Sequence, residues 1–154
     1  MQPRPANEIA GGYSFLREAG VDGAPANVYG AGWIAAYSRR FGASRFAVVG
    51  EATGNYRDSA GELWQLYAFQ GGIRADIWRA GSITFFGQAL TGIEMFRVPG
   101  FSDNGFAFQP GGGIDTPLFG SARFRFQTDY RYAHYDDANF HELRIGASVV
   151  FGFK

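Results

Sequence analysis

Residues 123–132, RFRFQTDYRY, alternate between two kinds of side chain with a period of two. Arg, Gln and Asp hold the odd positions, and Phe, Thr and Tyr hold the even ones. Successive side chains of a β-strand point to opposite faces, so this pattern predicts a strand with one charged face and one largely aromatic face. Residues 142–153 repeat the alternation, and strands of about ten residues are long enough to cross a bilayer at a tilt.

Six earlier segments show weaker forms of the same alternation, which brings the predicted number of strands to eight. These segments are residues 8–16, 28–38, 44–55, 63–77, 82–94 and 106–116. The composition agrees, because 23 glycines and 16 phenylalanines against 6 prolines favour strands and tight turns over helices. In the sixth segment Pro110 removes a ladder hydrogen bond, so we expect a β-bulge there.

The connections between the predicted strands alternate in length. Short turns fall at residues 39–42, 78–81 and 117–120, and longer polar loops fall at residues 17–27, 56–62, 95–105 and 135–139. The glycines that close the short turns, Gly42, Gly81 and Gly120, are spaced 39 residues apart in both intervals. A fixed period of this kind indicates repeated hairpins, each with one tight turn and one longer loop.

The length and composition exclude several classes of protein. The 154 residues fit a single domain, residues 1–154, and a formal net charge of zero with scattered charges argues against a nucleic-acid partner. The absence of cysteine removes thiolate metal sites, and we expect neither a metal nor a cofactor. No stretch approaches the roughly 18–20 apolar residues of a spanning helix. Residues 1–7 lack the features of a secretory signal, so we expect any such signal to have been removed.

The charged faces of the predicted strands have the features of an enclosed interior. They carry both signs of charge and many small residues, and every basic residue except Lys154 is Arg, whose planar fork satisfies several acceptors at once. An eight-stranded lumen is just wide enough to be filled by side chains, so we expect a salt-bridged plug rather than a conduction path. The predicted ion-pair network consists of Arg45, Glu51, Arg74, Glu94, Arg123, Arg125, Asp129, Arg131, Glu142 and Arg144.

Aromatic residues recur near the strand ends on the apolar faces. We expect them to form two girdles at the lipid headgroup levels, and short turns on one side with longer loops on the other are typical of outer-membrane barrels. A soluble lipocalin-like barrel with its faces reversed remains an alternative. The predicted girdle residues are Tyr13, Tyr29, Tyr37, Phe46, Tyr67, Phe85, Tyr132 and Phe153.

The hairpin pattern, the Arg-rich faces and the final segment SVVFGF, residues 148–153, resemble the small outer-membrane β-barrel superfamily that includes the OmpA transmembrane domain and OmpX. The resemblance covers nearly the whole chain. It implies an all-β, closed antiparallel up-and-down transmembrane barrel in the bacterial outer membrane, in contact with lipid and lipopolysaccharide. In that family the barrel assembly machinery reads an aromatic residue at the end of the last strand, which implies this role for Phe153, although Lys154 follows it here. We expect a monomer.

Two functions from different classes remain open. The first is a non-enzymatic barrel that serves envelope structure or surface interaction through its long loops. The second is a lipid A-modifying hydrolase that uses His134 or His141 near the extracellular rim. No Ser lies two residues from either histidine, and we expect no catalytic residue.

Overall fold

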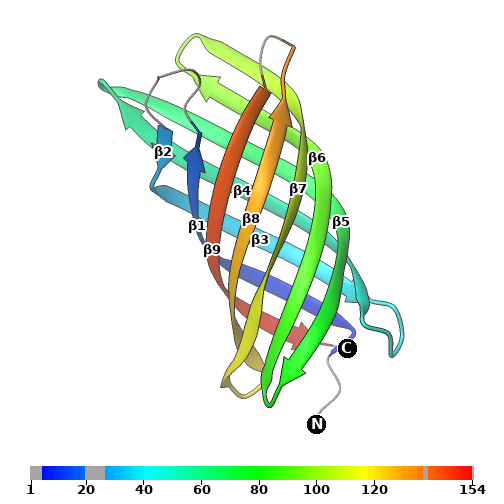
Figure 1. The fold of residues 1–154 in the computed structure, drawn as a ribbon. Coiled ribbons are helices and arrows are strands. Elements are labelled where there is room, and N and C mark those ends of the chain that lie inside the picture. The colour runs from blue at the N-terminus through cyan, green and yellow to red at the C-terminus, as the bar shows by residue number, and fades with distance from the viewer. Residues whose placement is uncertain (1–4, 20–26, 137–138, 154) are drawn as a thin grey trace.

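The computed structural model describes residues 5–19, 27–136 and 139–153, which form one antiparallel sheet. β1 pairs with both β2 and β3, each strand from β3 to β8 pairs with the next, and β1 also pairs with β9, so the sheet closes into a barrel (Figure 1). The strands are β1 (Asn7–Glu18), β2 (Asn27–Tyr29), β3 (Ala31–Arg40), β4 (Phe46–Ser59), β5 (Glu62–Ala80), β6 (Ile83–Val98), β7 (Phe101–Phe119), β8 (Ala122–His134) and β9 (Asn139–Phe153).

Strands β2 and β3 act as one barrel strand interrupted at Gly30, so the prediction of a closed eight-stranded barrel is confirmed. Both pair with β1, where Leu16 lies opposite Tyr29 and Tyr13 lies opposite Trp33. Between these pairs β1 advances three residues while the β2–β3 strand advances four. This extra residue shifts the register by one, and a one-residue shift exchanges the inward and outward faces.

At one end of the barrel the turns are short. β5 and β6 are joined by residues 81–82, and β7 and β8 by residues 120–121. Gly81 has φ +62° and Gly120 has φ +52°, a backbone conformation that glycine adopts without steric cost. The third glycine of the predicted period, Gly42, also has a positive φ, in the turn of residues 41–45. The end that carries these turns is called the turn end below.

At the opposite end, called the loop end, two of the predicted long loops are wrong. β4 and β5 continue to a two-residue turn at Ala60 and Gly61, both with positive φ, and β6 and β7 continue to a turn at Pro99 and Gly100. Residues 56–62 and 95–105 were expected to be loops because they are polar. Instead, β4 pairs with β5 and β6 pairs with β7 through most of these segments. Figure 1 shows both hairpins projecting from the loop end.

The β-bulge predicted at Pro110 is also wrong. Pairing of β7 with β8 is interrupted at Gln109 and Pro110, but the register is the same on both sides of the interruption. Proline therefore removes a ladder hydrogen bond without inserting a residue. Apart from the shift at Gly30, the irregular registers lie near the short turns, between Asp76 and Trp78 and between Pro117 and Phe119.

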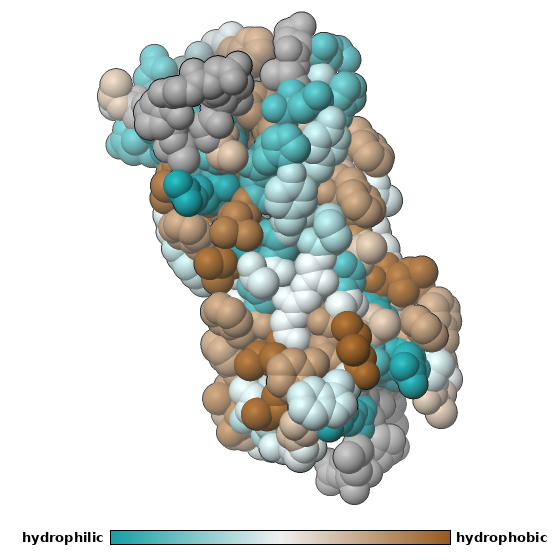
Figure 2. All heavy atoms as spheres, in the orientation of Figure 1, coloured by the Kyte–Doolittle hydropathy of each residue, from teal (hydrophilic) through white to brown (hydrophobic). Residues whose placement is uncertain are grey.

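The barrel is apolar outside and polar inside. Ile73, in the middle of β5, is 54% exposed, whereas Arg144 in β9 is completely buried. Figure 2 shows hydrophobic side chains over the middle and lower parts of one face, with most of the hydrophilic ones gathered at the loop end. This distribution contradicts the soluble lipocalin-like alternative, which places its charges in water, and matches a barrel surrounded by hydrocarbon. No helix in the described ranges is long and apolar enough to span a membrane.

Glycines on the inward face allow the interior side chains to fit. A Cβ atom at Gly72 would overlap the backbone carbonyl of Ala89, and one at Gly92 would overlap that of Phe69. Both glycines share a strand face with buried charged residues. Glycine at these positions lets neighbouring strands approach closely. Because glycine has no side chain, the volume of the lumen is left for the long polar side chains.

Candidate functional site: the ionic lumen and the loop-end cavity

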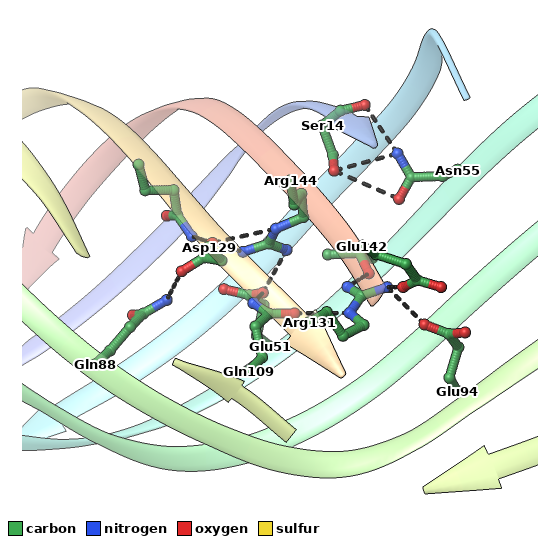
Figure 3. A network of polar contacts seen from close by, with 12 residues as sticks. Ser14, Glu51, Asn55, Gln88, Glu94, Gln109, Asp129, Arg131, Glu142 and Arg144 are labelled. Atoms are coloured by element: carbon green, nitrogen blue, oxygen red, sulfur yellow. Dashed lines mark hydrogen bonds and ion pairs between the residues drawn. The ribbon is translucent and has the colours of Figure 1, made fainter. Parts of the chain in front are cut away.

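A buried ionic centre built around Arg144 fills the middle of the barrel (Figure 3). Its Nη1 lies 2.5 Å from Oε1 of Glu51 in β4, and its Nη2 lies 2.5 Å from Oδ2 of Asp129 in β8. Asp129 also accepts hydrogen bonds from Gln88 at 3.1 Å and Gln127 at 2.9 Å. The arginine fork thus holds two carboxylates from different strands. The side-chain amides of Gln88 and Gln127 donate to the remaining acceptor sites of the Asp129 carboxylate.

Towards the loop end, Arg131 forms the centre of a second group (Figure 3). Its Nη1 lies 3.1 Å from Oε2 of Glu94 and 3.5 Å from Oε1 of Glu142, and its Nε donates to Gln109 at 2.7 Å. Gln109 in turn donates to Glu51 at 3.4 Å. The two groups are therefore one network that crosses the lumen.

Towards the turn end, Arg125 binds Asp115 through two hydrogen bonds of 2.7 and 2.8 Å. The guanidinium carbons of Arg125 and Arg74 lie 5.0 and 4.9 Å from the ring centroid of Phe86, within cation–π range. Arg74 donates to Oε1 of Gln88 at 3.0 and 2.8 Å, which connects this group to the central one. Further ion pairs at this end join Arg40 to Glu8 and Asp76, Arg79 to Asp76, and Arg123 and Arg125 to Glu8.

All predicted network residues except Arg45 lie inside the barrel. Alternation places Arg45 on the same face as Glu51, but β4 begins only at Phe46, and Arg45 is exposed in the preceding turn. The prediction is wrong there because alternation has meaning only within a strand. Sequence reasoning also omitted members that the same alternation could have found, since they lie on the charged faces of their strands: Glu8, Asp76, Gln88, Gln109 and Asp115.

The aromatic residues predicted for the girdles lie on the outer surface except for Tyr29. Tyr29 is completely buried, because the register shift at Gly30 turns it inward, and its assignment to a girdle is wrong. The sequence prediction also omitted Trp78, which is 62% exposed near the turn end and stacks on Phe85 with a centroid distance of 5.2 Å. The exposed or half-exposed predicted members are Tyr13, Tyr37, Phe46, Tyr67, Phe85, Tyr132 and Phe153.

A cavity of about 380 Å³ lies above the ionic network at the loop end. Its wall includes Trp64 and Phe96, whose rings meet edge to face with centroids 5.6 Å apart, and Tyr135 and Phe140, which meet in the same way at 5.4 Å. Trp64 and Phe96 come from the extended parts of β5 and β6, Tyr135 follows the end of β8, and Phe140 lies near the start of β9. The lining consists of Glu18, Asn27, Tyr29, Trp64, Leu66, Glu94, Phe96, Phe101, Asp103, Tyr135 and Phe140.

Tyr135 joins the cavity to the network. It follows the end of β8, and its hydroxyl donates a hydrogen bond of 2.7 Å to Oε1 of Glu94. Burial, followed by the nearby charge of Glu94, raises the pKa of Tyr135 well above its ordinary value. The phenol therefore stays protonated at neutral pH and acts as a fixed donor at the floor of the cavity.

The two histidines lie on the outer surface at the loop end. Nδ1 of His134 lies 2.5 Å from Oδ1 of Asn139, and His141 contacts the hydroxyl of Tyr130 and packs near Tyr132. The contacts described for them involve neither a serine nor the buried carboxylates. Within the described residues, no group of three His, Cys, Asp or Glu is placed to hold a metal ion.

Solved structures with the same fold are known. Neisserial surface protein A (NspA) superposes with a TM-score of 0.79 at 11% identity, covering 99% of this chain and 100% of that chain. Ail, the attachment invasion locus protein of Yersinia pestis, superposes with a TM-score of 0.60 at 20% identity, covering 96% and 99%. Ail in complex with the heparin analogue sucrose octasulfate gives a TM-score of 0.54 at 19% identity, covering 94% and 97%.

No protein-family model and no curated protein matches the sequence. The likeness to NspA and Ail therefore concerns the fold, which the barrel closure and the inside-out distribution of polarity support independently. The chain has the fold of the small eight-stranded outer-membrane β-barrels, like NspA and Ail.

Proposed function

We propose that the protein is an integral outer-membrane barrel that conducts no solutes and acts through its loop end. The observation that carries this proposal is the continuous network from Arg125 through Arg144 to Arg131, whose members are almost completely buried. Moving an ion through such a lumen would require breaking bonds between buried charges, and the groups left unpaired would carry a high energetic cost. The network thus favours a rigid plug over a pore.

The lipid environment is part of the same proposal. The exposed apolar residues would contact lipid, and the tyrosines and tryptophans near the strand ends would lie at the headgroup levels, including those of lipopolysaccharide. Phe153, the last residue of β9, is exposed at the turn end, where it is available to the barrel assembly machinery. Among the described residues, the β1–β9 pairing closes the sheet from the turn end through the middle, so this part of the barrel offers no free edge for pairing with another copy, which supports a monomer.

The loop end supplies the surface for interaction. The β4–β5 and β6–β7 hairpins extend as paired strands rather than as irregular loops, so they present fixed side chains outside the membrane. Ail, which shares the fold, is an attachment invasion protein that has been crystallised with a heparin analogue. We propose surface interaction as the general role of this protein, and the heparin analogue bound by Ail is not part of the proposal.

Two measurements test the plugged barrel. The protein refolded in detergent should migrate differently on a gel before and after boiling, as a detergent-stable barrel does. In planar bilayers it should give no defined conductance steps, whereas a sixteen-stranded porin measured in the same way should give large ones, because its lumen is an aqueous channel. Reproducible conductance steps from this protein would contradict the plug.

The alternative function, a lipid A-modifying hydrolase that uses His134 or His141, can be tested by substitution of both histidines. A variant with His134→Ala and His141→Ala should leave the lipid A of an expressing host identical to that produced with the unaltered protein. The comparison also needs host cells that lack the protein. A change in lipid A that requires the unaltered protein and disappears in the double variant would establish the enzyme and overturn the non-enzymatic proposal.

A further inference from the structure

The loop-end cavity has the size and shape of a small-molecule site. Its volume of about 380 Å³ lies within the range of ligand pockets, roughly 300–1,000 Å³. Tyr29 and Leu66, two of its lining residues, form a packed apolar cluster with Leu16; all three are at most 1% exposed, and Trp64 and Phe96 pack against them. The walls are therefore formed before any ligand arrives, and they favour a flat apolar group.

The charges around the cavity do not balance. Its lining contains three carboxylates, Glu18, Glu94 and Asp103, and no basic residue. Glu142 lies directly behind Glu94, and the single guanidinium of Arg131 serves both of them. Of the other arginines near this end, Arg17 and Arg97 are exposed, and Arg57 contacts Asn27 and lies 5.2 Å from the ring centroid of Trp64. Four carboxylates thus face two guanidiniums, and the site favours an additional positive charge.

A second and independent feature points to a polar ligand group. The hydroxyl of Tyr29 has no hydrogen-bond partner within the described part of the chain, although Tyr29 is completely buried and lines the cavity. Glu18 and Glu94 line the same cavity, so the hydroxyl shares this space with two carboxylates. Buried polar groups are normally hydrogen-bonded, so this hydroxyl is an unused contact for a ligand.

We propose that the loop-end cavity binds an organic cation, a protonated amine carried on a flat apolar body. The ammonium would lie between the carboxylates and the Tyr29 hydroxyl, and the apolar body would pack against Trp64, Phe96 and Phe101. Aromatic rings attract cations through their faces, which adds to the attraction of the carboxylates. This inference deepens the proposed function, because it rests on the loop end being the part of the barrel that meets external ligands.

Tryptamine is a suitable probe because it joins a primary amine to an indole. Its binding can be measured by isothermal titration calorimetry on protein in phosphatidylcholine nanodiscs, with the heat from empty nanodiscs subtracted. Tryptamine should give a saturable one-site isotherm, and indole-3-propionate, which has a carboxylate in place of the amine, should bind at least about tenfold more weakly.

Variants locate the site. Glu18→Gln keeps the oxygen that accepts the 3.1 Å hydrogen bond from Asn27 but removes the charge, and it should weaken tryptamine binding about tenfold. Tyr29→Phe should weaken it by a smaller factor, about threefold. Glu62→Gln is the matched control, because Glu62 is an exposed acid at the start of β5 and does not line the cavity. It should bind tryptamine as the unaltered protein does.

Three results would overturn the inference. One is the absence of saturable tryptamine binding. This result is expected if Glu142 and Glu94 share a proton, because that proton would already reduce the excess negative charge at the cavity. Another is equal affinity for tryptamine and indole-3-propionate, and the third is equal loss in Glu18→Gln and Glu62→Gln. Heat-modifiability and the absence of conductance are measured on the same samples. A folded, non-conducting protein that does not bind tryptamine would leave the barrel proposal standing and remove only the cavity ligand.

Discussion

The middle of the barrel and its loop end fill the same kind of lumen in different ways. In the middle, Arg144 lies between Glu51 and Asp129, and two glutamine side chains donate further hydrogen bonds to the Asp129 carboxylate. At the loop end, carboxylates outnumber guanidiniums around the cavity, the buried Tyr29 hydroxyl has no hydrogen-bond partner among the described residues, and aromatic rings surround open space. The middle, where long polar side chains bind one another across the lumen, is a rigid plug, whereas the loop end encloses open space and keeps contacts available for a ligand.

The largest expected effect is in the middle. Arg144→Met removes the cation between two carboxylates that are at most 5% exposed, and leaving buried charges unpaired should lower the free energy of unfolding by about 3–5 kcal/mol. Urea unfolding of the protein in lipid vesicles, followed by tryptophan fluorescence, measures the loss. Arg97→Gln is the control, because Arg97 is exposed, and it should cost less than about 0.5 kcal/mol. Equal effects of the two substitutions would contradict the difference between plug and surface.

A pair of glycine substitutions compares packing in the two regions. Gly72→Ala places a methyl group against the carbonyl of Ala89 in the crowded middle, and it should destabilise the barrel by roughly 1–3 kcal/mol. Gly30→Ala, at the loop-end register shift, meets no atom within 4 Å and should change stability by less than about 0.5 kcal/mol. The same urea titrations apply. If Gly30→Ala proved the more harmful substitution, the register shift would require glycine for a reason other than space.

Tyr29→Phe should act in the opposite direction to the change at Arg144. Removing a buried hydroxyl that has no partner in the described ranges should stabilise the empty barrel by about 1 kcal/mol, because the desolvation of that group is no longer a cost. The denaturation midpoint should rise with no change in slope. A fall in the midpoint would mean that the hydroxyl is already satisfied, and it would weaken the case for the cavity ligand.

The smallest effect is expected at the tip of the β4–β5 hairpin. Ala60 has φ +53°, which is strained for a residue with a Cβ atom, so Ala60→Gly should relieve about 0.5–1 kcal/mol locally. Slower amide hydrogen exchange at the ends of β4 and β5 would report this gain, while exchange near Arg144 should be unchanged. Altered exchange throughout the barrel would indicate that the hairpin and the network are coupled.

Much of the fold is predictable from local pattern. The strands around residues 123–132 and 142–153 appear where alternation placed them, and Gly81 and Gly120 lie in the short turns that their spacing predicted. The inward position of Arg131 and Glu142 follows from the same alternation. These predictions work because a side chain's face in a strand depends only on its position within that strand.

The errors arise where pairing between strands decides the outcome. Tyr29 turned inward because the β2–β3 strand contains one more residue than β1 between two pairs, which no single strand reveals. The β4–β5 and β6–β7 hairpins were mistaken for loops, because polar composition indicates contact with water but does not distinguish a loop from a paired strand outside the membrane. Gly61 and Gly100, both with positive φ, are the turn residues of these hairpins.

The sequence by itself determined the number of strands, the two faces of each strand and the kinds of side chain on them, since these depend on a period of two. Only the tertiary structure decided which charges meet, as with Glu51 in β4, which is far in sequence from its partner Arg144 in β9. It alone also revealed the cavity, because an enclosed space depends on how strands are staggered around the barrel. Stagger is a property of strand pairs and of closure, and it leaves no period in the chain.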